Sequence, residues 1–194
     1  MQSGIGHPDG QRRGGRVAYQ GAPGSSSHAA CLSLRPWDEP VGHRSFQDAM
    51  DALRSGACDC ALIPVENSTV GEIKPASDLV QRCGFPVVTE VWWPVRFALM
   101  GVEGARLSDL RTAESHPVAL DQCVASLAQL RLQPVEQYDT GGAAEAVAES
   151  GDVTRAAIAP AQAAEVYGLT ILKQDVQDRA DNRTRFVLLT REGG

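Results

Sequence analysis

Short apolar runs alternate with segments of helical periodicity along most of this chain. Strands are predicted for the apolar runs at 16–20, 60–65, 86–93, 95–101, 111–115, 134–138, 155–159 and 185–190. Helices are predicted where apolar residues recur every three or four positions, at 28–34, 46–55, 75–83, 116–127, 141–150 and 160–168. Because helices that connect strands cover the faces of a sheet, this alternation predicts an α/β fold.

Small polar residues and glycines mark where several of these helices begin and end. One of the serines at 25–27 and Ser45 are predicted to cap the first two helices, and Gly56 is predicted to end the second. Ser115 is predicted to cap the fourth helix. Pro117 then falls in the first turn, where its missing N–H costs nothing.

Three loops of small polar residues, at 21–27, 66–69 and 115–116, each follow a predicted strand. In open α/β sheets, ligands bind beyond the carboxyl ends of the strands, where helix N-termini offer free N–H groups and a positive dipole end. Caps and turns explain any one of these loops, whereas the three together favour a ligand site. The pattern therefore predicts a site that holds an anionic ligand without a basic surface.

Composition and charge exclude several classes of protein. The chain has 194 residues, 43% hydrophobic and 22% charged, which is typical of a folded domain. Its net charge of −6 argues against a nucleic-acid partner, and no apolar run approaches the roughly 18 residues of a membrane span. Residues 1–16 are polar, Gly-rich and basic, and are predicted to form a disordered leader rather than a secretory signal. A cytoplasmic location is therefore expected.

The cysteines point to a reducing compartment rather than to a metal. Five are present, at Cys31, Cys58, Cys60, Cys83 and Cys123. Their number is odd, and no His-x-x-His or second close cysteine pair completes a zinc site around Cys58 and Cys60. Buried free thiols and no metal are predicted.

Five stretches match a known family in order along the chain. They are VAYQGAPGSSSHAA (17–30), DCALIPVENSTVG (59–71), TAESHPVALDQC (112–123), AAIAPAQAAEVYGLTIL (156–172) and DNRTRFVLL (181–189). Through them the sequence resembles the prephenate dehydratases over essentially all of 17–190. Glu-Asn-Ser at 66–68, together with Thr-Arg-Phe at 184–186, is the most specific part of the match.

The resemblance implies a two-lobed fold similar to type II periplasmic binding proteins, with the ligand in a cleft between α/β lobes joined by crossing strands. On that map, 17–93 and 175–190 form lobe one and 94–174 form lobe two. Trp92, Trp93 and Phe97 are interpreted as core or hinge packing where the chain passes between the lobes.

The activity that the resemblance implies is the conversion of prephenate to phenylpyruvate, carbon dioxide and water, in L-phenylalanine biosynthesis. This is a carbon–oxygen lyase reaction of a small molecule, and it uses no metal or organic cofactor. Arogenate dehydratase, prephenate decarboxylase and a non-enzymatic solute-binding module are the alternatives. The residues do not decide between prephenate and its amino analogue arogenate.

The resemblance also implies catalytic residues. Thr184 is expected to donate a hydrogen bond or proton to the departing hydroxyl of the substrate. Asn67 and Ser68 are expected to hydrogen-bond substrate oxygens, since an amide side chain has both donors and acceptors. Glu66 is counted with the catalytic residues, and three other roles stay open for it: orienting its neighbours, forming a salt bridge with Arg185, or a purely structural role.

Further positions are expected to bind the substrate. By resemblance these are Ser26, Ser27, Ser115, His116, Gln122, Thr140 and Arg185. Ser115 and Gln122 are seven residues apart, two helical turns on similar faces, and Thr140 is expected to cap a helix facing the cleft. His116 is either a general base or a structural histidine. Arg185 either pairs with a substrate carboxylate or forms an ion pair within the protein.

The chain ends shortly after the Thr-Arg-Phe segment. Most bacterial members of the family carry a C-terminal ACT domain that binds phenylalanine, and about 70–80 further residues would be needed for it. No ACT domain and no feedback by phenylalanine are therefore expected for this chain, which is either a naturally unregulated protein or the excised catalytic portion of a longer one. A homodimer is the default expectation for the oligomeric state.

Overall fold

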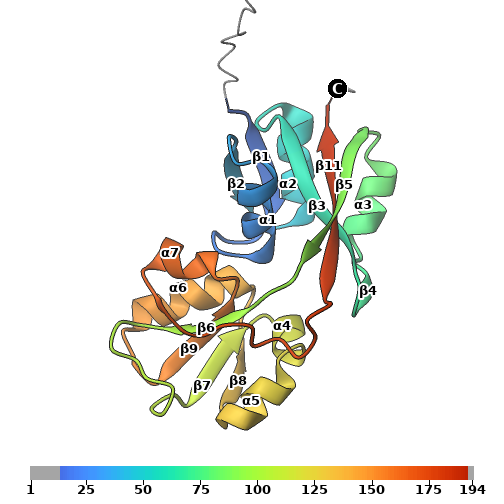
Figure 1. Cartoon of the computed structure of the whole chain (residues 1–194). Coiled ribbons are helices and arrows are strands. Elements are labelled where there is room, and N and C mark those ends of the chain that lie inside the picture. The colour runs from blue at the N-terminus through green and yellow to red at the C-terminus, as the bar shows by residue number, and fades with distance from the viewer. Residues whose placement is uncertain (1–13, 192–194) are drawn as a thin grey trace, which may run out of the picture.

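The computed structural model describes residues 14–191. Within them the chain forms two α/β lobes that lie one above the other (Figure 1). Of the predicted leader, residues 1–13 lie outside the described part, and Arg16 is already the first residue of the first strand. Among residues 14–191, no helix combines the length and the apolar character needed to cross a membrane.

A six-stranded sheet forms the centre of the first lobe. Its strand order is β2-β1-β3-β11-β5, and β4 pairs with β3. The strands are β1 (Arg16–Gln20), β2 (Glu39–His43), β3 (Cys60–Asn67), β4 (Gly71–Glu72), β5 (Val87–Pro94) and β11 (Arg183–Thr190). Strand β11 comes from the far end of the chain and runs antiparallel between β3 and β5, with Thr184 opposite Asn67. The sheet therefore brings together two segments that are 117 residues apart.

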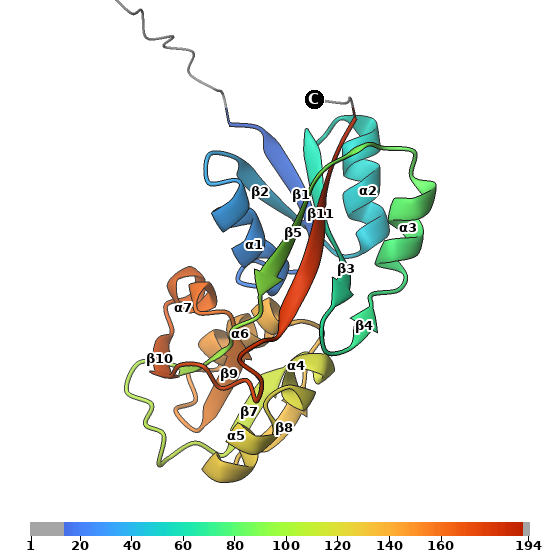
Figure 2. The same ribbon diagram turned by 45° about the vertical axis from the view of Figure 1, so that its right-hand side comes forward.

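Helices cover both faces of this sheet (Figure 2). Helix α1 (Ser26–Leu34) packs on one face, and α2 (Phe46–Ser55) and α3 (Ala76–Arg82) pack on the other. Because side chains alternate along a strand, Val17 and Tyr19 of β1 face α1 while Ala18 faces α2. Both faces of this mixed sheet are thus apolar, as is usual where helices cover a sheet on both sides.

The second lobe contains a five-stranded sheet in the order β10-β6-β9-β7-β8. Its strands are β6 (Ala98–Gly101), β7 (Thr112–Ser115), β8 (Gln133–Glu136), β9 (Arg155–Ala159) and β10 (Thr170–Lys173). Its helices are α4 (Pro117–Asp121), α5 (Val124–Leu130), α6 (Thr140–Ser150) and α7 (Gln162–Tyr167). Alanines at 98, 143, 144 and 157 are buried where α6 meets the sheet, so helix and sheet approach closely.

Two segments cross between the lobes. Residues 95–97 lead from β5 to β6, and residues 174–182 lead from β10 back to β11 (Figure 1). The predicted fold class, two α/β lobes joined by crossing strands, is confirmed. The strands of the first sheet lie within 16–94 and 183–190, and those of the second within 98–173. The division into domains at 93/94 and 174/175 stays a prediction.

Several local predictions were wrong. The predicted helix at 116–127 is two helices that break at Gln122 and Cys123. Strands β2, β4 and β10 were not predicted, since each is short and β2 contains a proline and a glycine. Trp92 is 43% exposed rather than core, because β5 is an edge strand, whereas Phe97 is buried as predicted.

The cysteine prediction is confirmed in that all five are free thiols, and four of them are buried. Burial raises the pKa of Cys60 to about 11 and that of Cys123 to about 12, so both thiols stay protonated near neutral pH. Across residues 14–191, no group of three or more His, Cys, Asp or Glu side chains is placed to hold a metal ion.

Candidate functional site

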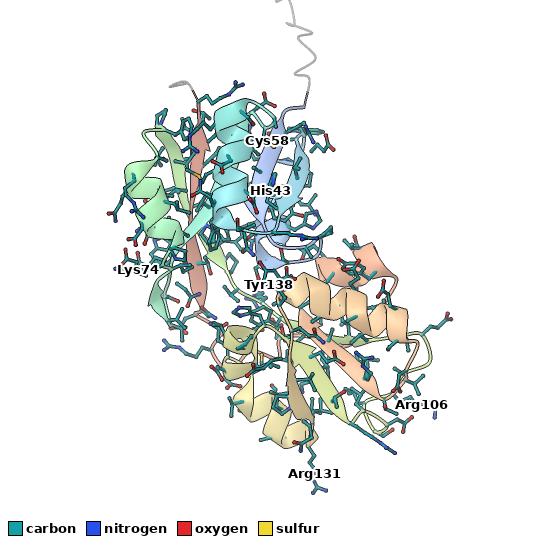
Figure 3. The ribbon with its side chains drawn as sticks, turned by 180° about the vertical axis from the view of Figure 1, so that it is seen from behind. His43, Cys58, Lys74, Arg106, Arg131 and Tyr138 are labelled. Carbon is teal, nitrogen blue, oxygen red and sulfur yellow. The ribbon has the colours of Figure 1, made fainter. Side chains whose placement is uncertain are left out.

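A cleft of about 870 Å³ lies between the lobes and receives side chains from both. Of the residues singled out from the sequence, those lining it are Ser26, Ser27, Asn67, His116, Gln122, Thr140 and Thr184. Tyr138 lines the cleft as well, and Figure 3 shows it at the junction of the lobes. The three predicted loops therefore meet at one place, although not every residue in them faces it.

Thr184 and Asn67 lie side by side at the end of the first sheet. Asn67 Nδ2 donates to Thr184 Oγ1 at 3.1 Å and to Asn182 Oδ1 at 2.9 Å. Its Oδ1 accepts the backbone N–H groups of Thr69 and Val70. All three polar side chains are buried, with exposed fractions of 2–8%. Asn67 is therefore held by four hydrogen bonds and cannot rotate its amide without losing them.

This arrangement leaves the donor position of the Thr184 hydroxyl open. Its oxygen accepts from Asn67, and no acceptor among residues 14–191 takes its proton. A hydroxyl has one donor and two acceptor positions, so the Thr184 O–H remains available to an oxygen bound in the cleft. Asn67 Nδ2 donates to two protein groups, so neither amide hydrogen is left for the substrate oxygen that it was expected to bind.

The serine loop, residues 21–27, supplies another part of the cleft wall. Ser25 is the N-cap of α1, and Ser26 and Ser27 form the first turn of the helix at the edge of the cleft. The first turn of a helix has backbone N–H groups with no partner inside the helix. Together with the two hydroxyls they can donate to an anionic ligand.

The structure corrects the prediction for Ser115. It was predicted to cap a helix and to contact an anion, but it is the last residue of β7 and fully buried. Its Oγ donates to the carbonyl of Ile158 at 2.6 Å, which ties β7 to β9. The cap is His116, whose Nδ1 accepts the N–H of Val118 at 3.2 Å. The structural role considered for His116 is thus confirmed, while its ring also lines the cleft.

Gln122 and Thr140 line the cleft in positions that differ from those predicted. Gln122 is the C-cap of α4 and does not share a helix face with Ser115. Thr140 is the first residue of α6, and the cap of that helix is Asp139. The Asp139 carboxylate accepts Gly142 N–H at 2.6 Å and, across the cleft, Ala22 N–H at 2.9 Å. Asp139 therefore joins α6 to the loop of the first lobe.

Glu66, Ser68 and Arg185 do not line the cleft. Arg185 Nε lies 3.0 Å from Glu66 Oε2, and its Nη1 lies 2.8 Å from Glu90 Oε2. Because alternate residues of a strand face opposite ways, Arg185 points away from the side of the sheet that holds Thr184. The salt bridge considered for Glu66 and Arg185 is present, while the catalytic role of Glu66 and the substrate contact of Arg185 stay predictions from the resemblance.

Ser68 has a structural role next to Thr184. Its hydroxyl accepts the N–H of Arg183 at 2.9 Å, and its own N–H donates to the Arg183 carbonyl at 2.8 Å. Ser68 is exposed and does not reach the cleft. The expected contact of Ser68 with substrate is therefore corrected to a tie between the turn after β3 and the start of β11.

Cationic side chains in the cleft were missed by the sequence analysis. Arg44, Lys74 and Arg82 line it, together with the carboxylates of Glu72 and Asp139. Glu72 accepts from Ser77 at 2.8 Å and lies 3.7 Å from Lys74. The guanidinium of Arg44 has no hydrogen bond or ion pair within residues 14–191.

Arg44 was missed because β2 was not predicted. With β2 in place, Arg44 falls between the end of a strand and the cap Ser45 of α2. That is the same pattern that singled out the other loops. Tyr138 of the second lobe donates its hydroxyl hydrogen to the Arg44 carbonyl, so this loop too is tied across the cleft.

Gly141 of α6 lies where the two lobes approach closely, and a side chain there is expected to disturb the cleft. A Cβ on Gly141 would lie 2.4 Å from the Pro23 carbonyl oxygen and 2.9 Å from Ser25 N. Gly141→Ala is therefore expected to push the serine loop away from α6 and to raise KM about tenfold, since small misplacements of binding groups are costly. Gly142→Ala is the matched control, because its nearest neighbour is the Asp139 side chain at 3.4 Å. Steady-state kinetics check both, and equal KM values for the two variants would contradict the expectation.

Comparison with known proteins adds to this geometry. A family model described as prephenate dehydratase matches residues 17–194. Arogenate dehydratase/prephenate dehydratase 1, chloroplastic, from Arabidopsis thaliana is 42% identical over 177 residues, covering 91% of this chain and 45% of that protein. A bifunctional N-acyl-homoserine lactone acylase/prephenate dehydratase from Komagataeibacter europaeus is 37% identical over 175 residues, covering 90% of this chain and 62% of that protein.

A solved structure of a prephenate dehydratase has the same fold. The prephenate dehydratase from Arthrobacter aurescens, in complex with L-Phe, superposes with a TM-score of 0.84 and 25% identity, covering 92% of this chain and 61% of that one. The chain spans about half the length of the plant relatives that it matches. The family model covers nearly the whole chain, and its matched range contains every residue that lines the cleft. The chain belongs to the prephenate dehydratase family.

Proposed function

We propose that the chain catalyses the decarboxylative dehydration of prephenate to phenylpyruvate, carbon dioxide and water, a hydro-lyase step in L-phenylalanine biosynthesis. The observation that carries the proposal is the Thr184 hydroxyl. Asn67 occupies its oxygen as an acceptor and leaves its proton for a ligand in the cleft. A donor fixed in advance at a leaving oxygen stabilises the charge that develops there.

The reaction has simple chemical requirements. The bond between C1 and the ring carboxylate breaks, and its electron pair enters the ring as the C4–oxygen bond breaks. The ring becomes aromatic, and the departing hydroxide takes one proton that comes in the end from solvent. Orientation and a hydrogen bond to the leaving oxygen are therefore the main contributions asked of the protein. Thr184 supplies that hydrogen bond.

The two carboxylates of prephenate need anion-binding groups on either side of Thr184. The hydroxyls and free N–H groups of Ser26 and Ser27 are one such group. Arg44 is the other, because its guanidinium is free and can bind a carboxylate with two parallel hydrogen bonds. His116, Gln122 and Thr140 complete the lining on the side of the second lobe.

Arg44 gives a prediction for substrate binding. Arg44→Gln is expected to lower kcat/KM about tenfold, mainly by raising KM, since a hydrogen bond to a charged group contributes about 1.5–3 kcal/mol and Arg44 is exposed. The kcat/KM of Arg44→Lys is expected to fall between those of the wild-type protein and Arg44→Gln, because lysine keeps the charge and loses the bidentate geometry. Arg106→Gln, an exposed arginine away from the cleft, is the control. An unchanged KM in Arg44→Gln would remove this residue from the site.

Arogenate is the alternative substrate, and relatives named for either activity match the chain. It shares the ring and the leaving hydroxyl, so the role of Thr184 is the same for both. The test is to incubate the protein with prephenate and with arogenate and to identify the products by mass and aromatic absorbance. Phenylpyruvate from prephenate supports the proposal. Phenylalanine from arogenate alone would make the chain an arogenate dehydratase, and a non-aromatic hydroxy keto acid would make it a decarboxylase.

Tight binding without turnover would instead support the solute-binding alternative. A binding module could use the same hydroxyl to hold a ligand oxygen, so turnover of prephenate is the result that separates the two readings. The cytoplasmic location, the homodimer and the absence of regulation by phenylalanine stay predictions from the sequence.

A further inference from the structure

A buried histidine lies behind the serine loop and has no place in the reaction described above. His28 is the third residue of α1 and is 8% exposed. Its Nδ1 accepts the backbone N–H of Gly24 at 2.9 Å. The backbone N–H of His28 donates to Ser25 Oγ at 3.4 Å. The two contacts resemble a capping box, in which a side chain in the first turn reaches back to the residues before the helix.

Gly24 is held in a conformation that needs this support. Its φ is +81°, and a Cβ there would lie 2.9 Å from the Cβ of Ala163 in the second lobe. The left-handed backbone and the close contact both require glycine. A flexible residue in a fixed conformation loses entropy on folding, and the hydrogen bond to His28 offsets part of that loss.

The same loop joins the two lobes. Ala22 N–H donates to Asp139 at 2.9 Å, and the Tyr167 hydroxyl donates to the Pro23 carbonyl at 2.9 Å. The loop then continues into Ser26 and Ser27 in the cleft wall. A change in the shape of the loop would therefore alter the substrate-binding wall and the contact between lobes together.

We propose that His28 is a positioning residue, whose neutral imidazole holds the 21–25 loop in the shape that presents Ser26 and Ser27 to the substrate. To accept from Gly24, Nδ1 must carry a lone pair, so the ring proton is on Nε2. Protonation places an N–H on Nδ1, facing the Gly24 N–H, and the hydrogen bond is lost. Substrate binding is then weakened at acid pH.

The groups around His28 do not titrate in the same range. Burial raises the pKa of Tyr19, whose ring centroid is 5.5 Å from that of His28, and raises the pKa of Cys31 on the same helix. Burial also raises the pKa of Tyr167 on α7 to about 12. The charged group beyond them is Asp139, whose oxygens accept backbone N–H groups. Burial lowers the pKa of His28 itself, consistent with a ring that is neutral at physiological pH.

Two variants of the full chain test the proposal. His28→Asn places Oδ1 where histidine has Nδ1, so it keeps an acceptor that does not titrate. His28→Leu has a similar volume and no acceptor. KM for prephenate is measured from about pH 5 to 8, with the uncatalysed conversion subtracted at each pH. In parallel, NMR measures the exchange rate of the Gly24 amide, which needs no substrate.

The proposal predicts a KM for the wild-type protein that rises toward acid pH. His28→Asn is expected to keep the wild-type KM at neutral pH and to lack the acid rise. His28→Leu is expected to have a KM about 5- to 10-fold higher at every pH, with faster Gly24 exchange. An acid rise that persists in His28→Asn, or wild-type KM and Gly24 exchange in His28→Leu, would overturn the proposal.

His43→Asn is the matched control, because burial also lowers the pKa of His43. This variant is expected to keep the rise of KM toward acid pH. If His43→Asn lacked that rise, the titration would belong to His43 and the proposal would be overturned. The KM measurement rests on the proposed function, whereas the amide measurement does not. If the wild-type protein does not convert prephenate, that function fails. Gly24 exchange then decides alone: faster exchange in His28→Leu than in His28→Asn supports the positioning role, and equal rates overturn it.

Discussion

Thr184→Ala is expected to lower kcat about 100- to 1000-fold and to change KM little, because removing one preorganised donor to a developing oxyanion typically costs this much. The hydroxyl is buried, is oriented by Asn67 and lines the cleft. Truncation to alanine removes the hydroxyl and the γ-methyl group, so the donor is lost and no volume is added. Steady-state kinetics measure the effect, and circular dichroism confirms that the variant folds.

Two further variants make this result specific. Thr184→Ser keeps the hydroxyl and is expected to retain more activity than Thr184→Ala, with some loss because serine is freer to rotate. Thr89→Ala removes an exposed threonine from the neighbouring strand β5 and serves as the control. Near-normal kcat in Thr184→Ala would remove this residue from the chemistry.

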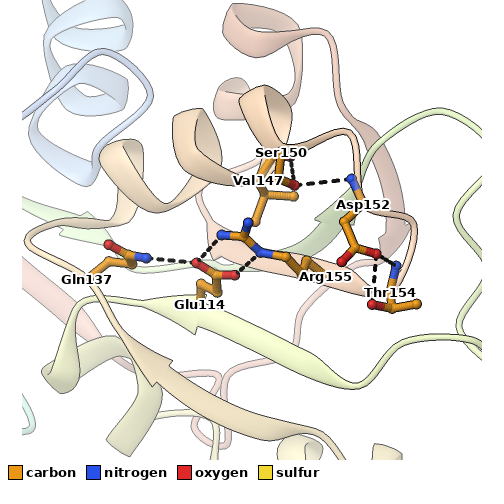
Figure 4. A network of polar contacts seen from close by, with 7 residues as sticks. All are labelled: Glu114, Gln137, Val147, Ser150, Asp152, Thr154 and Arg155. Atoms are coloured by element: carbon orange, nitrogen blue, oxygen red, sulfur yellow. Dashed lines mark hydrogen bonds and ion pairs between the residues drawn. The ribbon is translucent and has the colours of Figure 1, made fainter.

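The ion pair between Arg155 and Glu114 is expected to stabilise the folded protein. Arg155→Ala is expected to lower the free energy of unfolding by about 3 kcal/mol, because it leaves the buried carboxylate of Glu114 without its cation. Glu114 is 2% exposed, and its two oxygens lie 2.6 and 3.0 Å from Arg155 nitrogens, while Gln137 donates to it at 2.7 Å (Figure 4). The estimate is at the lower end for a buried pair, since the Arg155 side chain is 32% exposed. Urea unfolding measures the change.

The control for this prediction is Arg106→Ala, which removes an exposed arginine of the same lobe and is expected to change stability by less than about 0.5 kcal/mol. Arg155→Lys is expected to lie between the two, because lysine keeps the charge but loses one of the two parallel hydrogen bonds. Equal stability of Arg155→Ala and Arg106→Ala would show that the ion pair contributes nothing.

The same carboxylate makes stability depend on pH. Burial alone would raise the pKa of Glu114, but the hydrogen bonds from Arg155 and Gln137 and the charge of Arg155 outweigh it and hold this pKa below its ordinary value of 4.5. In the unfolded chain Glu114 then binds a proton at a higher pH than in the folded protein. Its contribution to stability is therefore present above pH 4.5 and is lost as the pH falls through the lowered folded-state pKa. In Glu114→Gln this part of the acid dependence is expected to be absent.

The contact between Thr184 and Asn67 shows how much of the candidate site can be predicted from the sequence. Alternating strands and helices predict the sheets, and loops that follow strands predict the edge at which a ligand binds. The segment around Thr184 was assigned to that edge by its resemblance to a family. The hydrogen bond between the two side chains depends on the register of β11 against β3, which no local pattern specifies, because strands so distant in sequence pair through tertiary contacts.

Differences between the expected and the observed site have the same origin. Glu66 and Arg185 belong to the right strands, but the pleat turns them to the opposite face. Ser115 follows the helix-cap pattern, but it is the neighbouring His116 that caps the helix, while Ser115 hydrogen-bonds to Ile158. Arg44 was missed because the strand before it, β2, carries a proline and a glycine and forms at the edge of the sheet. For Ser115 and Arg44, tertiary contacts decided between two locally reasonable structures.

The ratio of products tests the central claim most directly. The wild-type protein and Thr184→Ala are incubated with prephenate, and phenylpyruvate and carbon dioxide are quantified together. The account predicts one phenylpyruvate for each carbon dioxide with the wild-type protein, and formation of both lowered about 100- to 1000-fold in Thr184→Ala. Carbon dioxide without phenylpyruvate, or equal rates for the two proteins, would contradict it.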